Sequence, residues 1–204
     1  MQVTKVESVT KTKFRVEIDM EFAFVLYKGE LKRFGIVEEA EITEEAYEKI
    51  RNEVVLKRAK LRALHLLTDM ARTEKELKEK LRLSQYPEDI IEAAMDYVRS
   101  FGYLNDEQYA KNYVESRKDS KSRKELHAAL VNKGVSSEWI ESAFEAGYGE
   151  EGEREAIRKL IVKRRVNPLY ATEKEMYKLY GYLARKGFYY EQIRKVIEEM
   201  CGNA

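Results

Sequence analysis

The sequence predicts a mainly α-helical protein: an elongated tandem array of three three-helix repeats, preceded by a small N-terminal β-hairpin domain. Only two prolines and ten glycines occur in 204 residues, so long stretches are free of helix breakers. Three segments align with one another without gaps, which is the sequence signature of a repeat protein. Strand-like alternation is confined to the first 36 residues.

The amino-terminal residues predict two strands joined by a turn. Segments 12–19 (TKFRVEID) and 20–27 (MEFAFVLY) carry apolar side chains at every second position, the period of a half-buried strand. The turn is expected at 19–21, and a third short extended piece over 31–34. Thr43 then offers an N-cap hydroxyl to a helix that continues into the repeats, which completes a first domain of residues 1–50.

From residue 51 the hydrophobic period is helical, and repeats are expected over 51–105, 106–149 and 150–204. Each aligned segment starts at an anchor leucine: Leu81, Leu130 or Leu183. Every anchor has a leucine four residues before it and an isoleucine ten residues after it. These residues are Leu77, Leu126 and Leu179, and Ile91, Ile140 and Ile193. A single unit buries little core, so the units are expected to stack.

A capping box precedes each anchor and predicts the start of the middle helix of each repeat. The three pairs are Thr73 with Glu76, Ser122 with Glu125, and Thr172 with Glu175. The third box begins three residues earlier relative to its anchor, so the middle helix of the last repeat is expected to be longer.

Two stiff joints between repeats are predicted. Gly102 suits the left-handed position that ends a helix, with Tyr103 folding back near Val98, and Asn105 or Asp106 suits the cap of the next helix. Gly147 and Tyr148 are expected to repeat this arrangement at the second joint. The predicted joint residues are Gly102, Tyr103, Asn105, Asp106, Gly147 and Tyr148.

The titratable residues form no catalytic or metal-binding pattern. His65 and His127 lack the spacing of a metal pair, and Cys201 has no adjacent base. The stretch 147–152 (GYGEEG) matches the glycine fingerprint of dinucleotide sites, but a helix precedes it and its glutamates would repel phosphates. We therefore predict no enzyme activity, no cofactor and no metal.

Charge and cysteine content restrict the environment and the partners. Charged residues make up 37% of the chain but nearly cancel to +1, so binding to nucleic acid requires a local patch. One cysteine excludes an internal disulfide and favours a reducing compartment, which predicts a cytoplasmic protein. The sequence contains no run of 18 apolar residues, so no membrane span is predicted.

Two basic clusters, 117–124 (RKDSKSRK) and 158–165 (RKLIVKRR), are the best candidates for a contact surface, and they have a smaller counterpart at 72–75. Recurrence at equivalent places would form a basic track for a phosphate backbone, although charge runs are often only solvated faces. The candidate contact residues are Arg72, Lys75, Arg117, Lys118, Lys121, Arg123, Lys124, Arg158, Arg164 and Arg165.

The fourteen tyrosines allow two interpretations. They suit stacking on unpaired bases, but packing between helices is favoured because Tyr180 and Phe188 lie among the apolar positions of the third repeat. Trp139 is likewise expected to be buried between helices.

The segments 71–81 (ARTEKELKEKL), 101–110 (FGYLNDEQYA) and 130–140 (LVNKGVSSEWI) resemble the RecX regulatory proteins of bacteria in order and spacing. The resemblance covers nearly the whole chain, and the leading strands look like the extension of the longer members from Gram-positive relatives. Met20 departs from the family by replacing a common hairpin glycine. Gln85-Tyr86 is a second departure, in place of the Lys-Gly seen at 133–134 and 186–187.

The resemblance implies a non-catalytic modulator that lies in the groove of the RecA filament on single-stranded DNA and inhibits recombinase, ATPase and coprotease activities. We expect the protein to be a monomer. Any direct DNA binding is expected to be weak. Two alternatives stay open: a DNA-binding protein that uses its units as helix-turn-helix readers, and a helical protein-binding scaffold unrelated to recombination.

Overall fold

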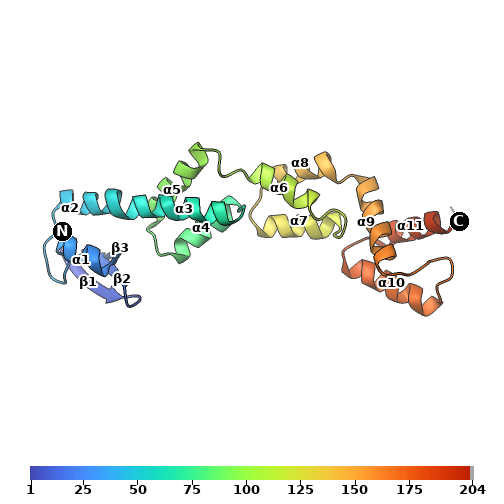
Figure 1. Cartoon of the computed structure of the whole chain (residues 1–204), viewed down its shortest axis with the longest axis horizontal. Helices are drawn as coiled ribbons and strands as arrows, with labels where there is room; N and C mark the ends of the chain where they lie inside the picture. The colour runs from blue at the N-terminus through green and yellow to red at the C-terminus, as the bar shows by residue number, and fades with distance from the viewer. Residues whose placement is uncertain (203–204) are drawn as a thin grey trace. The chain divides into compact units, whose positions relative to one another are not determined.

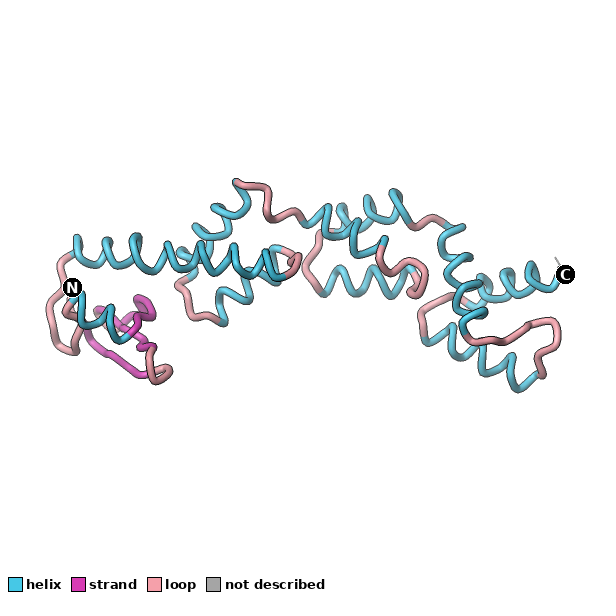
Figure 2. Tube along the Cα trace, in the orientation of Figure 1, coloured by secondary structure: helices cyan, strands magenta, loops and turns pink. Residues whose placement is uncertain are grey.

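The computed structural model describes residues 1–202 and confirms a mainly helical fold with an N-terminal antiparallel sheet (Figure 1). The chain divides into two compact units, Met1–Asn105 and the part that begins at Asp106. Within the described residues, strands occur only at the start of the first unit (Figure 2). The elongated arrangement of the repeats and their boundaries stay predictions.

The first unit contains the sheet and the helices of the first repeat. Its elements are β1 (Val3–Ser8), β2 (Lys13–Ile18), β3 (Glu21–Tyr27), α1 (Lys28–Phe34), α2 (Glu44–Lys49), the π-helical segment η1 (Ile50–Leu56), α3 (Lys57–Asp69), α4 (Glu74–Leu83) and α5 (Glu88–Ser100). The helix capped by Thr43 is confirmed, because Thr43 Oγ1 accepts a hydrogen bond from Ala46 N at 3.2 Å. From there α2, η1 and α3 follow one another without a break (Figure 1).

The sheet has the order β1-β2-β3 and differs from the prediction in two ways. Sequence reasoning missed β1, since Val3 is its only fully buried residue. The prediction of an extended piece over 31–34 is wrong, because this segment is the end of helix α1. Glu30 accepts a hydrogen bond from Tyr27 N at 2.7 Å and so satisfies a free amide at the helix start, as an N3 glutamate does in a capping box.

The turn between β2 and β3 lies where the sequence placed it. Asp19 and Met20 have φ of 50° and 68°, the left-handed pair that suits a tight hairpin. Met20 is 85% exposed, so the side chain that replaces the usual glycine points to solvent.

The sheet and the first three-helix repeat share one hydrophobic core. It runs from Val3 to Leu104 and includes Phe24 of β3 together with Leu77 and Leu81 of α4, all with zero exposure. The strands are therefore packed against the helices of the first unit as part of a single folded body.

The second unit contains two three-helix sets, each around its own core. Their elements are α6 (Asp106–Glu115), α7 (Arg123–Asn132), α8 (Ser137–Gly147), α9 (Glu150–Lys163), α10 (Glu173–Arg185) and α11 (Tyr190–Gly202). The anchor residues Leu130 and Leu183 are fully buried in these two cores. Phe188 is buried as predicted, whereas Trp139 is only half-buried at the edge of its core.

The structure confirms two of the three capping boxes. Those of Thr73 and Thr172 are complete. Ser122 accepts from Glu125 N at 3.1 Å, but the Glu125 carboxylate contacts Lys121 instead of closing the box. The longer middle helix of the last repeat is confirmed, since α10 has 13 residues and α4 and α7 have 10 each.

The turn after each middle helix contains a left-handed residue four positions beyond the anchor. In the second and third repeats it is Gly134 (φ 83°) and Gly187 (φ 87°), but in the first it is Gln85 (φ 61°). Gln85 therefore aligns with the glycine of the other two repeats. The alignment of Gln85-Tyr86 with Lys-Gly was displaced by one residue. A side chain in this conformation costs about 1–2 kcal/mol.

We expect Gln85→Gly to stabilise the protein by about 0.5–1 kcal/mol, because relief of left-handed strain exceeds the backbone entropy of glycine. Urea unfolding followed by circular dichroism measures the change. Gly102→Ala is the matched control: Gly102 has φ 68° with open space around it, so it should lose about 1 kcal/mol. Destabilisation by Gln85→Gly would show that the Gln85 side chain contributes more than the strain.

Candidate interaction surface

The two helix sets of the second unit meet at the first turn of α7. Ser122, the N-cap residue, is fully buried there. Glu153 of α9 is 8% exposed and accepts hydrogen bonds from Arg123 N (3.3 Å) and from Gln192 Nε2 (2.9 Å). A carboxylate at a helix amino terminus is favourable because it faces unsatisfied amides. Gly187 packs against the same cap, and a Cβ on it would overlap the Ser122 hydroxyl oxygen.

Tyr148 closes the other side of this contact. It is 1% exposed, and its hydroxyl donates to the Lys121 carbonyl oxygen at 2.6 Å. Burial, reinforced by the nearby carboxylates of Glu153 and Asp119, raises the pKa of the Tyr148 hydroxyl well above its usual range. Tyr148 is therefore a neutral core residue that holds the α6–α7 loop.

The two predicted joints differ in geometry. At the first, Gly102 has φ 68° and Tyr103 N donates to the Val98 carbonyl at 3.2 Å, as expected of a left-handed helix end. Helix α6 begins at Asp106, directly after Asn105. Gly147, by contrast, belongs to α8 and has no positive φ, so the expected equivalence of the second joint is wrong. A role of either joint in curvature stays a prediction.

Cluster 117–124 is largely neutralised by carboxylates of its own unit. Lys118, Lys121 and Arg123 form ion pairs at 2.5–2.7 Å with Glu115, Glu125 and Glu141 respectively. The other two cations lie over aromatic rings instead. Arg117 is 4.0 Å from the centroid of the Tyr113 ring, and Lys124 is 5.9 Å from that of Tyr189.

Cluster 158–165 is divided in the same way. Arg158 contacts the carboxylates of Glu151 and Glu199 at 3.0 and 2.6 Å, and these bonds raise the pKa of its guanidinium. Lys159 pairs with Asp119 at 2.8 Å and so joins the two clusters. Arg164 lies 3.9 Å from the centroid of the Tyr182 ring. Arg165 is exposed, with φ 56°.

Four candidate residues of the two clusters thus keep a positive charge without a carboxylate partner among residues 1–202. These unpaired cations are Arg117, Lys124, Arg164 and Arg165. The remaining two candidates belong to the first unit. Arg72 donates from Nε to the Leu66 carbonyl at 3.0 Å, and Lys75 lies in the first turn of α4. The spacing in the sequence located the cations but gave no indication of which carboxylates they meet.

The other residues considered from the sequence have structural surroundings. His65 Nδ1 is 3.3 Å from Asp69, and the His127 ring stacks on Phe144. Across residues 1–202, no three His, Cys, Asp or Glu side chains are grouped as metal ligands. None of the helices in this described part is long and apolar enough to cross a bilayer. The fold and this surface together define a tandem three-helix protein that exposes charged and aromatic residues.

Comparison with known proteins gives the family. Profiles of the first, second and third three-helix domains of RecX match residues 59–97, 105–143 and 151–197. Regulatory protein RecX of Caldanaerobacter subterraneus is 36% identical, with 97% of this chain and 98% of the relative covered. The corresponding protein of Clostridium botulinum strain Eklund 17B is 28% identical, with 97% and 95% covered.

Two solved structures are similar to this chain. A crystal structure of regulatory protein RecX shares the fold, with a TM-score of 0.62, 24% identity and coverage of 100% and 99%. That of RecX from Lactobacillus salivarius gives a TM-score of 0.59 and 25% identity, with 71% of this chain and 96% of that chain covered. The chain belongs to the RecX family of regulatory proteins.

We expect Gly187→Ala to destabilise the second unit by more than about 2 kcal/mol, since left-handed strain adds to overlap with the Ser122 hydroxyl. Chemical unfolding of Gly187→Ala, Ser122→Ala and the double variant forms a thermodynamic cycle. The double variant should lose less than the sum of the single losses, because alanine at 122 removes the overlapping oxygen. Additive losses would mean that the two residues do not meet.

Proposed function

We propose that this protein is a non-catalytic regulator that binds the RecA filament on single-stranded DNA and inhibits its recombinase, ATPase and coprotease activities. The observation that supports it is the succession of three matched RecX domains over residues 59–197. Relatives over nearly the full length carry the name regulatory protein. RecA acts on DNA in the cytoplasm of bacteria, which is where we place this protein.

Repetition of modules suits a filament as a target. A filament presents the same surface at regular intervals, so a chain with several modules can engage more than one protomer. The first contact raises the effective concentration of the next, and modest contacts multiply. A monomer is sufficient for this mode of binding.

We propose the ten basic residues as the contact face, with the unpaired cations as its strongest members. Exposed ion pairs contribute about 0–1 kcal/mol, so a phosphate or carboxylate of the partner can replace the intramolecular partner of the others at small cost. Arg117, Lys124 and Arg164 need no such exchange, because their neighbours are tyrosine rings. These residues present both charge and apolar surface, which suits a target composed of protein and DNA.

We expect the wild type to inhibit the DNA-stimulated ATPase of RecA at substoichiometric concentration. Replacement of all four unpaired cations by glutamate should raise the concentration for half-inhibition by about tenfold or more, through loss of phosphate or carboxylate contacts. A matched control replaces Lys174, Arg185, Arg194 and Lys195 by glutamate; these exposed cations of α10 and α11 do not belong to the proposed face. It should inhibit like the wild type.

Other outcomes of this assay separate the alternatives. Equal weakening of both variants would mean that net charge acts rather than the proposed face. Absence of inhibition by the wild type would favour a scaffold unrelated to recombination. Submicromolar, sequence-selective binding to duplex DNA without RecA would favour a helix-turn-helix reader, against which a net charge of +1 argues.

A further inference from the structure

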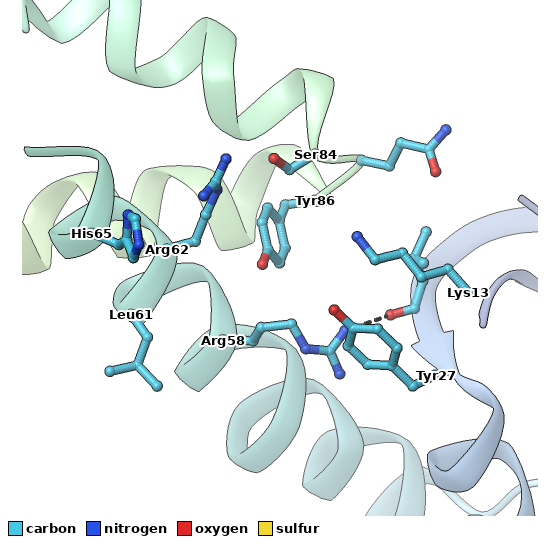
Figure 3. A pocket seen from close by; sticks show the side chains of 10 residues that line it. Lys13, Tyr27, Arg58, Leu61, Arg62, His65, Ser84 and Tyr86 are labelled. Carbon is cyan, nitrogen blue, oxygen red and sulfur yellow. Dashed lines mark hydrogen bonds between the residues drawn. The ribbon is translucent and has the colours of Figure 1, made fainter. Parts of the chain in front are cut away.

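The first unit contains a cavity of about 510 Å³ that none of the ten basic residues lines. Its walls come from the sheet, from α3 and from the turn between α4 and α5 (Figure 3). Ligand sites commonly have volumes of about 300–1,000 Å³, so this cavity can hold a molecule of nucleotide size.

The cavity is electropositive. Arg58 is held in its wall: it pairs with Glu30, donates to the Val25 carbonyl at 3.1 Å and lies 4.6 Å from the centroid of the Tyr27 ring. Lys13 and Arg62 also line it, and within residues 1–202 neither has a carboxylate partner. Two positive charges are thus left for an anionic ligand.

The turn that borders the cavity differs from its two counterparts in the chain. Gln85 keeps the left-handed conformation that the other repeats give to glycine. Tyr86 takes the place of Val135 and Phe188, which are 5% and 3% exposed, yet it is only half-buried. Figure 3 shows Tyr86 reaching from the turn into the cavity, with Lys13 and Tyr27 on the opposite wall. Strain that a repeat could avoid is typical of functional positions.

We propose that this cavity binds one nucleotide unit of single-stranded nucleic acid. Lys13 and Arg62 supply cations for the phosphate, the ring of Tyr86 supplies aromatic surface for the base, and the Gln85 amide suits a base edge. An acidic peptide would use the cations but not the ring. A duplex keeps its base faces stacked and cannot offer one. The site does not depend on the proposed action on a recombinase.

The test uses the full chain without any recombinase, so its result is independent of the ATPase assay. Fluorescence anisotropy follows a labelled ten-residue oligothymidylate at low salt. We expect saturable binding that weakens at least fivefold in Arg62→Glu and in Tyr86→Leu. Lys49→Glu, an exposed lysine of α2 outside the cavity, is the charge-matched control and should bind like the wild type. Circular dichroism and thermal unfolding check that each variant is folded.

Competition by unlabelled molecules identifies the ligand that occupies the cavity. Unlabelled oligothymidylate should displace the probe at far lower concentration than a duplex of the same length, an abasic strand or a decaglutamate peptide. Displacement by the peptide or the abasic strand as readily as by the oligonucleotide would overturn the assignment of a base. Displacement by thymidine monophosphate at equal or lower concentration would show that the ligand is a free nucleotide and would overturn the assignment of a nucleic-acid strand. Equal binding by Arg62→Glu and Lys49→Glu, or no binding by the wild type, would overturn the site.

Discussion

The packing of the second unit depends on helix α7, whose amino terminus is buried. The first amides of an α-helix have no partner within it, and at α7 the cap residue Ser122 is fully buried. Protein groups must therefore replace water: the Ser122 hydroxyl takes one amide, and Glu153 from the next helix set takes another. Because Glu153 also binds Gln192, satisfying one helix start joins two repeats.

Pairing with carboxylates also determines which basic residues of the surface stay available to a partner. With acidic and basic residues nearly equal in number, half of the cations of the two clusters meet a carboxylate of their own unit, as Arg158 and Lys159 do. Charge remains available only where a cation lies over a ring or projects into solvent. A near-neutral protein thus keeps a few local positive sites without a general attraction to polyanions.

Many interactions between near neighbours were predictable from the sequence, and distant ones were not. The helix start at Thr43, the left-handed Gly102 and the repeat anchors depend on residues within about one or two turns. Strand β1 was missed because only Val3 is fully buried. Helix α1 was missed because its N-cap residue is Tyr27, which is not one of the usual capping residues. In the candidate surface, Arg158 meets Glu199 from 41 residues away, a distance that no spacing rule covers.

The same turn follows the middle helix in all three repeats, so a residue that differs in one of them is informative. Gly134 and Gly187 show that glycine fits the left-handed position, and Val135 and Phe188 show that the next residue can be buried apolar surface. The first repeat shares its core with a sheet, which places Lys13 and Tyr27 opposite this turn, whereas residues 106–202 contain no strand. The departures at Gln85 and Tyr86 thus occur in the repeat that shares its core with a sheet. Tyr86 packs part of its ring against the shared core, and the proposed ligand between sheet and turn would contact the part that stays exposed.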